Sequence, residues 1–152
     1  MLNENMASRR PTLKVAYSSM QESDRELAHI AEQLLDRHYV HGRHEVVTAM
    51  RLENGSTATG IHMEASQGRS SICAEGVALG QSIEKNSHIM SIISVLRRPD
   101  GELYLIEPCG VCAELLFDYC PDATIWVGDK AAMPKQVTVR DLLPFRKSRA
   151  GR

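Results

Sequence analysis

The chain has 152 residues, a formal net charge of -1 at pH 7, and 43% hydrophobic and 24% charged residues. This length suits one domain with a substantial core, and the composition is ordinary for a soluble globular protein. A chain without excess positive charge has no field to hold a polyanion, so we do not expect duplex nucleic acid as a partner. No run approaches the roughly 18 apolar residues of a membrane-spanning helix, and the N-terminus lacks the apolar core of a signal peptide. These features predict a cytoplasmic protein without a membrane partner.

Residues 1–20 mix polar, basic and small side chains without a sustained period, and we interpret them as a loose N-terminal extension without a chemical role. The remaining residues, 21–152, are expected to form one domain. Its first element is a helix that begins at Ser23, where Ser23-Asp24-Arg25-Glu26 has the form of a capping box. Apolar residues at helical spacing follow from Leu27 and carry this helix to about His38.

The rest of the chain alternates between predicted strands and helices. A hairpin is expected from strands 46–52 and 57–62, because Glu53-Asn54-Gly55 between them is a strong turn signal. Further strands are predicted over 88–96, 103–106 and 123–127, and further helices over 72–84 and 109–119, while the pattern over 136–143 fixes no element type. This order predicts an α/β fold with helices packed on a mixed sheet.

Two short motifs stand where predicted helices begin: Cys73-Ala74-Glu75 and Pro108-Cys109-Gly110-Val111-Cys112. Cys109 and Cys112 are three residues apart, so their sulfur atoms lie on one helix face and can share an ion. Three thiolates fill three corners of a tetrahedron and leave the fourth for water, which is typical of a catalytic zinc site. We also expect the positive ends of both helices to lower the pKa of these thiols.

Glu75 follows the first cysteine by two residues, so its carboxylate can reach water at the fourth position and act as a general acid and base. The alternatives are a closed structural zinc site and a thiol redox pair. The combined motifs nevertheless match the three-cysteine signature of the zinc-dependent nucleobase deaminases. Cys120 has no partner at ligand spacing, and we interpret it as a buried structural thiol.

With both motifs in place, the sequence resembles the small cytidine deaminases and, more distantly, the blasticidin S deaminases. The resemblance extends over about residues 26–145 and includes the turn Glu53–Gly60 and the C-terminal Val139–Phe145. It implies a three-layer α/β/α sandwich with a mixed five-stranded sheet, a Zn2+ cofactor, and hydrolysis of cytidine to uridine and ammonia in pyrimidine salvage. It also implies a homotetramer whose active sites borrow residues from neighbouring subunits, with a homodimer as the alternative.

The resemblance assigns substrate contacts to several residues. Glu64 stands where the family's ribose-binding carboxylate stands, and His62 replaces the family's asparagine. His44 occupies the position of the aromatic residue that stacks on the pyrimidine. The backbone N–H of Ala74 is expected to orient the base, and Pro108 to line the side where ammonia leaves.

Several positions depart from the family pattern. Glu107 replaces a small hydroxyl residue, and its carboxylate is suited to an N4 substituent or a cationic tail. Gly76 and Ala113 replace arginines that offset the surplus thiolate charge, and Arg69 is the candidate replacement.

The preferred substrate is therefore cytidine, deoxycytidine or a close analogue, because the full nucleoside-type spacing from His62 to Cys73 is kept. The alternative is a modified cytosine compound, such as an N4-substituted cytidine or the nucleoside antibiotic blasticidin S. A non-catalytic zinc-binding protein is the remaining alternative, and Glu75 argues against it because a structural site has no use for that carboxylate.

Overall fold

A mixed six-stranded sheet forms the centre of the molecule, in a computed structural model that describes residues 10–147. The strand order is β2-β1-β3-β5-β6, and β4 pairs with β3 beyond the end of the β3–β5 ladder. The β3–β5 pair is parallel, and every other pair is antiparallel. The strands are β1 (Val46–Leu52), β2 (Thr57–Ile61), β3 (Ile89–Arg97), β4 (Leu103–Ile106), β5 (Thr124–Gly128) and β6 (Pro134–Thr138).

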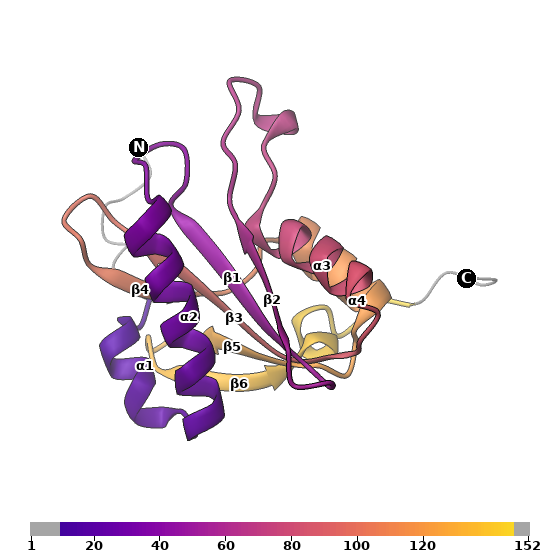
Figure 1. The fold of residues 1–152 in the computed structure, drawn as a ribbon. Coiled ribbons are helices and arrows are strands. Elements are labelled where there is room, and N and C mark those ends of the chain that lie inside the picture. Colours follow the sequence, from indigo (N-terminus) through magenta and orange to yellow (C-terminus); the bar gives the residue numbers. More distant parts are fainter. Residues whose placement is uncertain (1–9, 148–152) are drawn as a thin grey trace.

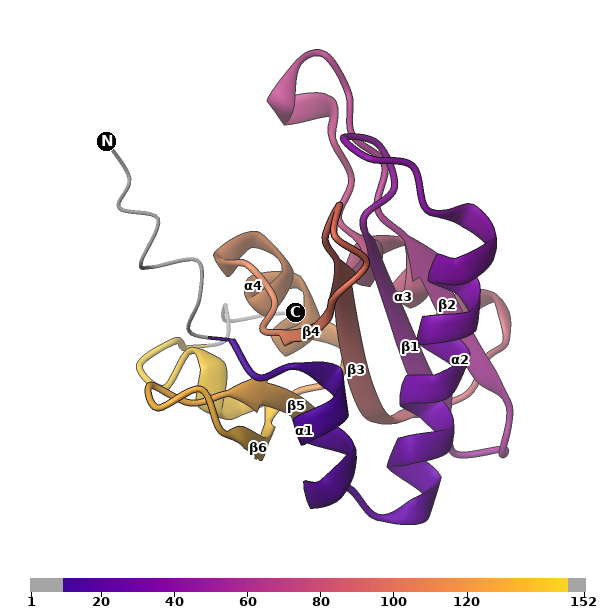
Figure 2. The same cartoon turned by 90° about the vertical axis from the view of Figure 1, so that its left-hand side faces the viewer.

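Helices cover both faces of this sheet (Figures 1 and 2). α1 (Leu13–Ser19) and α2 (Glu22–His38) lie on one face, and α3 (Ala74–Glu84) and α4 (Gly110–Tyr119) lie on the other. Alternate side chains of each strand enter opposite cores, so Ile93 packs with α1 and α2 while Ile92 packs with α3 and α4. The predicted three-layer α/β/α sandwich is confirmed. Within residues 10–147, no helix is long and apolar enough to cross a membrane.

The sheet has one strand more than the five that the resemblance implies. The additional strand, β6, includes the start of the segment whose type the sequence pattern did not fix. It ends at Thr138, where the chain turns into the 3-10 helix η3 (Val139–Leu142). Asp141 accepts hydrogen bonds from the backbone N–H and the hydroxyl of Thr138, and the backbone bond is the largest cause that lowers the pKa of Asp141. This cap explains why the strand stops there.

The N-terminal segment is not a loose extension over residues 11–20, which corrects the prediction from the sequence. Leu13, Ala16 and Met20 are buried in the core beneath α2, and Thr12 caps α1 with its hydroxyl. The backbone N–H of Leu105 donates to the carbonyl of Pro11 at 3.0 Å, which ties the segment to β4. A helix of seven residues is too short for its period to stand out in the sequence. Residues 1–9 lie outside the described residues.

The predicted capping box at Ser23 is also wrong. α2 begins at Glu22 with Gln21 as its N-cap, so Ser23 lies within the first turn. Asp24 is fully buried and accepts hydrogen bonds from Ser91, Trp126 and Gln136, which belong to three different strands. The helix start is therefore fixed by tertiary contacts rather than by a local cap.

Gly60 on β2 sets how closely α3 approaches the sheet. A Cβ at this position would collide with the backbone carbonyl of Ala74 and the backbone N–H of Ala78. Because both obstacles are main-chain atoms of α3, no rotamer change can relieve the collision. The glycine thus lets the first turn of α3, which carries Glu75, lie directly on the sheet.

Replacing Leu13 by Ala tests whether α1 belongs to the domain core. We expect Leu13→Ala to lower the free energy of unfolding by about 2–5 kcal/mol, because the leucine is 2% exposed. Val15→Ala in the same helix is the matched control, since Val15 is 44% exposed and its loss should change stability by no more than about 0.5 kcal/mol. Urea denaturation measures both, and equal effects of the two substitutions would contradict this packing.

Candidate active site

Three cysteines converge where α3 and α4 begin. Cys73 is the N-cap of α3, Cys109 is the N-cap of α4, and Cys112 lies in the first turn of α4. The three Sγ atoms lie within 4.8 Å of one another, and the Sγ atoms of Cys73 and Cys109 are 3.7 Å apart. α3 and α4 run side by side on one face of the sheet, which brings their N-termini together (Figure 1).

The electrostatics of this cluster favour a bound cation. Burial raises the pKa of Cys112, and the negative charge of Glu75 raises it further. Burial also raises the pKa of Cys73. Burial acts in the same direction on Cys109, but the backbone N–H of Cys112 and neighbouring donors outweigh it and lower the pKa of Cys109. The predicted lowering by the helix N-termini thus holds for Cys109 alone, and a metal ion bound between the three sulfur atoms would offset the charge of the thiolates.

The donor set fits zinc with a catalytic role. Three thiolates from two rigid helices supply three of four tetrahedral positions, and the part of the chain that the structure describes offers no other cluster of this kind. Cys120, interpreted from the sequence as a structural thiol, is buried and lies outside the cluster. Its burial raises its pKa to about 12.

Cys73 and Cys109 line a cavity of about 290 Å3 that also contains Glu75, whereas Cys112 is buried and is not among its lining residues. Glu75 is 4% exposed, and its Oε1 accepts a hydrogen bond from the hydroxyl of Ser94 at 3.2 Å. The Ser94 hydroxyl is in turn 2.7 Å from the hydroxyl of Thr48. The lining residues are Arg10, Val46, His62, Cys73, Ala74, Glu75, Ile106, Glu107, Pro108 and Cys109.

The structure brings four of the six predicted substrate contacts into this cavity: His62, Ala74, Glu107 and Pro108. Glu64 does not line the cavity but holds His62, because Nε2 of His62 donates to its carboxylate at 2.9 Å. Nδ1 of His62 is buried and has no hydrogen-bond partner among the described residues. The imidazole ring that carries this nitrogen belongs to a residue that lines the cavity.

His44 lies apart from the other predicted contacts. It lines a different cavity, of about 640 Å3, between β2 and the end of α2. Its Nδ1 donates to the backbone carbonyl of His62 at 2.9 Å, and this bond directs the ring toward the main chain. His44 is therefore not brought into the cavity that contains Glu75, and its predicted stacking on a base stays a prediction.

Arg10 is a cavity residue that sequence reasoning missed. Its guanidinium lies 3.2 Å from Oε1 of Glu107, and both side chains are partly exposed. Pro11 and Thr12, which pair with the β4 region, carry Arg10 to this place. Arg69, the predicted compensating charge, is exposed on the 3-10 helix η2 (Gly68–Ser70) and does not line the cavity. No local sequence signal marks Arg10, because only the tertiary position of the N-terminal segment brings it here.

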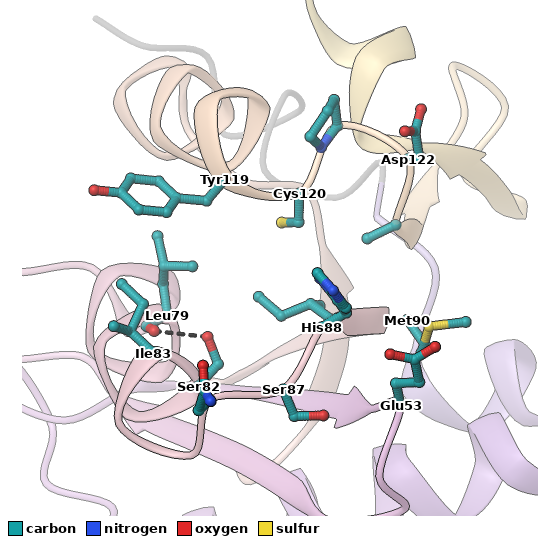
Figure 3. Close-up of a pocket in the computed structure, with 14 residues that line it drawn as sticks. Glu53, Leu79, Ser82, Ile83, Ser87, His88, Met90, Tyr119, Cys120 and Asp122 are labelled. Carbon is teal, nitrogen blue, oxygen red and sulfur yellow. Dashed lines mark hydrogen bonds between the residues drawn. The ribbon is translucent and has the colours of Figure 1, made fainter. Parts of the chain in front are cut away.

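A larger cavity of about 590 Å3 lies at the opposite ends of α3 and α4 (Figure 3). Tyr119 and Cys120 face Leu79 and Ile83 across it, and His88 also lines it. It shares no residue with the cavity of the cysteines. Size alone therefore does not identify the reactive site, whereas the cysteines and the buried glutamate do.

Three thiolates with an open fourth position beside a buried carboxylate define a zinc-dependent hydrolase. The family model described as cytidine and deoxycytidylate deaminase zinc-binding region matches residues 21–128. The chain therefore belongs to the cytidine and deoxycytidylate deaminase family, and it is a cytidine deaminase-like hydrolase with zinc as its cofactor.

Individual relatives agree with this assignment. A blasticidin-S deaminase from Bacillus cereus is 29% identical over 136 residues, which are 86% of this chain and 96% of that protein. A cytidine deaminase from Halalkalibacterium halodurans is 27% identical over 108 residues, 68% of this chain and 77% of that protein. The solved cytidine deaminase of Bacillus anthracis aligns with a TM-score of 0.71 at 21% identity, covering 82% of this chain and 89% of that one. The Mycobacterium leprae enzyme aligns with a TM-score of 0.65 at 21% identity, covering 82% and 99%.

Removing single cysteines tests the metal site. We expect Cys73→Ala and Cys112→Ala to lose most of the zinc, because two thiolates alone hold the ion weakly. Cys120→Ala is the matched control and should retain about one zinc ion per chain, since Cys120 lies outside the cluster. Elemental analysis of the purified proteins by mass spectrometry measures the content. Full zinc content in Cys112→Ala would refute this ligand set.

Proposed function

We propose that this protein hydrolyses the 4-amino group of a cytosine nucleoside, either cytidine, deoxycytidine or a close analogue. Water adds at C4, the C–N bond breaks, and the products are ammonia and the uridine form. The observation that carries the proposal is one cavity lined by Cys73 and Cys109 of the three-cysteine cluster, by the buried Glu75, and by His62, whose Nδ1 has no partner among the described residues. Zinc bound by Cys73, Cys109 and Cys112 supplies Lewis acidity that lowers the pKa of water.

Glu75 moves the protons in this proposal. Its carboxylate accepts a proton from the attacking water and delivers it to N3 of the ring. It then accepts the proton of the hydroxyl added at C4, as the carbonyl forms, and delivers it to the departing amine. The backbone N–H of Ala74 orients the base. Pro108, which is buried in the cavity wall, shapes the side where ammonia departs.

In this proposal His62 contacts the sugar, and Glu64 holds the ring of His62 in place. Because Nε2 of His62 donates to Glu64, a neutral ring keeps Nδ1 as an acceptor, which suits a sugar hydroxyl. The hydroxyl of Ser71 donates to the other oxygen of Glu64 at 3.0 Å and fixes that carboxylate. A substrate without the hydroxyl leaves Nδ1 buried and unpaired, so a free base is discriminated against.

A second candidate substrate is a cytosine nucleoside with a cationic substituent, such as blasticidin S. Glu107 lines the cavity next to Pro108, and its only partner of opposite charge among the described residues is Arg10. A cationic group on the substrate can replace Arg10 at this carboxylate. The Bacillus cereus relative, named as a blasticidin-S deaminase, supports keeping this candidate.

We also infer a homotetramer rather than a homodimer, and a role in pyrimidine salvage if cytidine is the substrate. Exposed apolar side chains stand next to metal ligands: Ile72 before Cys73, and Val111 before Cys112 with 78% of its surface exposed. The segment between β2 and α3 also projects beyond the sheet (Figure 1). A neighbouring subunit covering this region would exclude water from the cavity. Light scattering after gel filtration measures the mass that decides between these assemblies.

A substrate panel tests the proposed reaction. Zinc-loaded protein is assayed by ultraviolet absorbance with cytidine, deoxycytidine, cytosine, N4-substituted cytidines and blasticidin S. We expect turnover of at least one nucleoside and little turnover of cytosine. In Glu75→Gln, kcat should fall by about 10²–10⁴-fold at unchanged zinc content, because the amide cannot carry the proton. If zinc-loaded wild-type protein turns over none of these compounds, the proposal fails, and full activity in Glu75→Gln would refute the proton route.

The contribution of Glu107 separates the two substrate classes. For a substrate with a cationic tail, we expect Glu107→Gln to lower kcat/KM by about 10-fold, because a charge-assisted hydrogen bond is lost at a partly exposed site. The effect on cytidine should be smaller. Glu102→Gln, an exposed carboxylate outside the cavity, is the control. Equal losses of kcat/KM for both substrates would mean that Glu107 does not bind the cationic tail.

A further inference from the structure

The geometry points to Ser94 and Thr48 as positioning residues that hold the carboxylate of Glu75 for proton transfer. This inference rests on the proposed function, because it assigns Glu75 the role of proton carrier. Neither residue lines the cavity, so both act through Glu75 rather than on the substrate. Thr48, Ser94 and Glu75 together form a buried line of hydrogen bonds, which runs from Thr48 inside the sheet to the carboxylate of Glu75 at the cavity.

The two hydroxyls are brought together by the register of the sheet. Thr48 on β1 stands directly opposite Ser94 on β3 in the antiparallel ladder. Ile92 and Met50, each two residues away along its own strand, pack in the core of α3 and α4, so Thr48 and Ser94 face the same side. α3 crosses this face and carries Glu75 in its first turn. The pair therefore lies beneath the carboxylate.

The direction of the hydrogen bonds follows from the donors available. An ionised carboxylate only accepts, so the Ser94 hydroxyl must donate its proton to Oε1 of Glu75 across 3.2 Å. Ser94 then has only its oxygen left for Thr48, which must donate to it across 2.7 Å. Each hydroxyl polarises the next, which strengthens the bond that reaches Glu75. Both donors thus point toward the carboxylate.

Because both hydroxyls are buried, they form hydrogen bonds with each other and with Glu75 rather than with water. Ser94 is 1% exposed and Thr48 is fully buried, so water does not compete for either hydroxyl. Their neighbours on the same face are aliphatic, and an aliphatic pair would fill the same space without the cost of burying two hydroxyls. The hydroxyls are compensated because they bond each other and Glu75. Their presence at this place is explained by the carboxylate above them.

Fixing Oε1 leaves Oε2 as the oxygen that exchanges protons with water and substrate. A carboxylate without this anchor can rotate about its last side-chain bonds, and small displacements of a proton carrier lower the rate strongly. The hydrogen bond from Ser94 restricts that rotation. The expected consequence is a larger effect on kcat than on KM, because the substrate contacts are made by other residues.

The test compares three changes in this line with one matched control. For the nucleoside turned over best by wild-type protein, we expect Ser94→Ala to lower kcat by about 10–100-fold with KM changed by no more than about 3-fold. Thr48→Val, which keeps the shape but not the hydroxyl, should lower kcat by about 3–10-fold. Thr48→Ser retains the donor and should recover most of the activity. Zinc content and thermal midpoint are measured for every variant.

Ser91→Ala is the control for a purely structural effect. Ser91 is fully buried on the same strand but donates to Asp24 on the opposite face of the sheet. It should lower the thermal midpoint without lowering kcat at a temperature where the protein is folded. An unchanged kcat in Ser94→Ala, or an equal loss of kcat in Ser91→Ala, would overturn the inference.

Crystal structures of wild-type protein and Ser94→Ala give a readout that does not depend on turnover. We expect Glu75 to adopt a different or a mixed rotamer in Ser94→Ala, and an identical single rotamer would overturn the positioning role. Wild-type protein that turns over no compound overturns the proposed function instead. The two failures are therefore distinguished.

Discussion

The convergence of two helix N-termini at one end of the sheet is the constraint on which the site depends. Cys73 and Cys109 are separated by 36 residues, yet their Sγ atoms lie 3.7 Å apart. The parallel pairing of β3 with β5 requires the chain to cross over between them, and α4 makes this crossover on the face where α3 already lies. The three-sulfur cluster therefore follows from the strand order, and zinc binding is coupled to correct assembly of the sheet.

β3 links the two halves of the molecule through two buried serines that face opposite ways. Ser91 donates to Asp24 of α2, and Ser94 donates to Glu75 of α3. Both carboxylates are buried, and each is compensated by a hydroxyl from the same strand. The same strand thus supplies two serine–carboxylate hydrogen bonds, one that holds α2 on the sheet and one beneath the buried Glu75. This explains how a mainly aliphatic strand can support a polar site.

The sequence predicted those features that depend on local pattern. The cysteine motifs, Glu75, the hairpin, and every α-helix and strand between residues 46 and 128 follow from spacing and turn residues, with ends shifted by a few positions, whereas the 3-10 helix η2 was not predicted. Features that depend on tertiary contacts were missed or mistaken. Arg10 reaches the cavity only because α1 packs in the core, and His44 turns to the carbonyl of His62. The pairing of Thr48 with Ser94 needs the strand register, although two hydroxyls in apolar runs were a signal that could have been read.

Gly60 limits the ways in which this architecture can vary over time. The main chain of α3 occupies the space that a side chain at position 60 would need. The distance between α3 and the sheet is therefore fixed, and with it the depth at which Glu75 lies. Substitutions elsewhere in the core change side chains and cannot restore that spacing once it is lost. Substitution of partly exposed cavity residues, such as Arg10 and Glu107, leaves this spacing unchanged, so the opening of the cavity can vary while the depth of Glu75 does not.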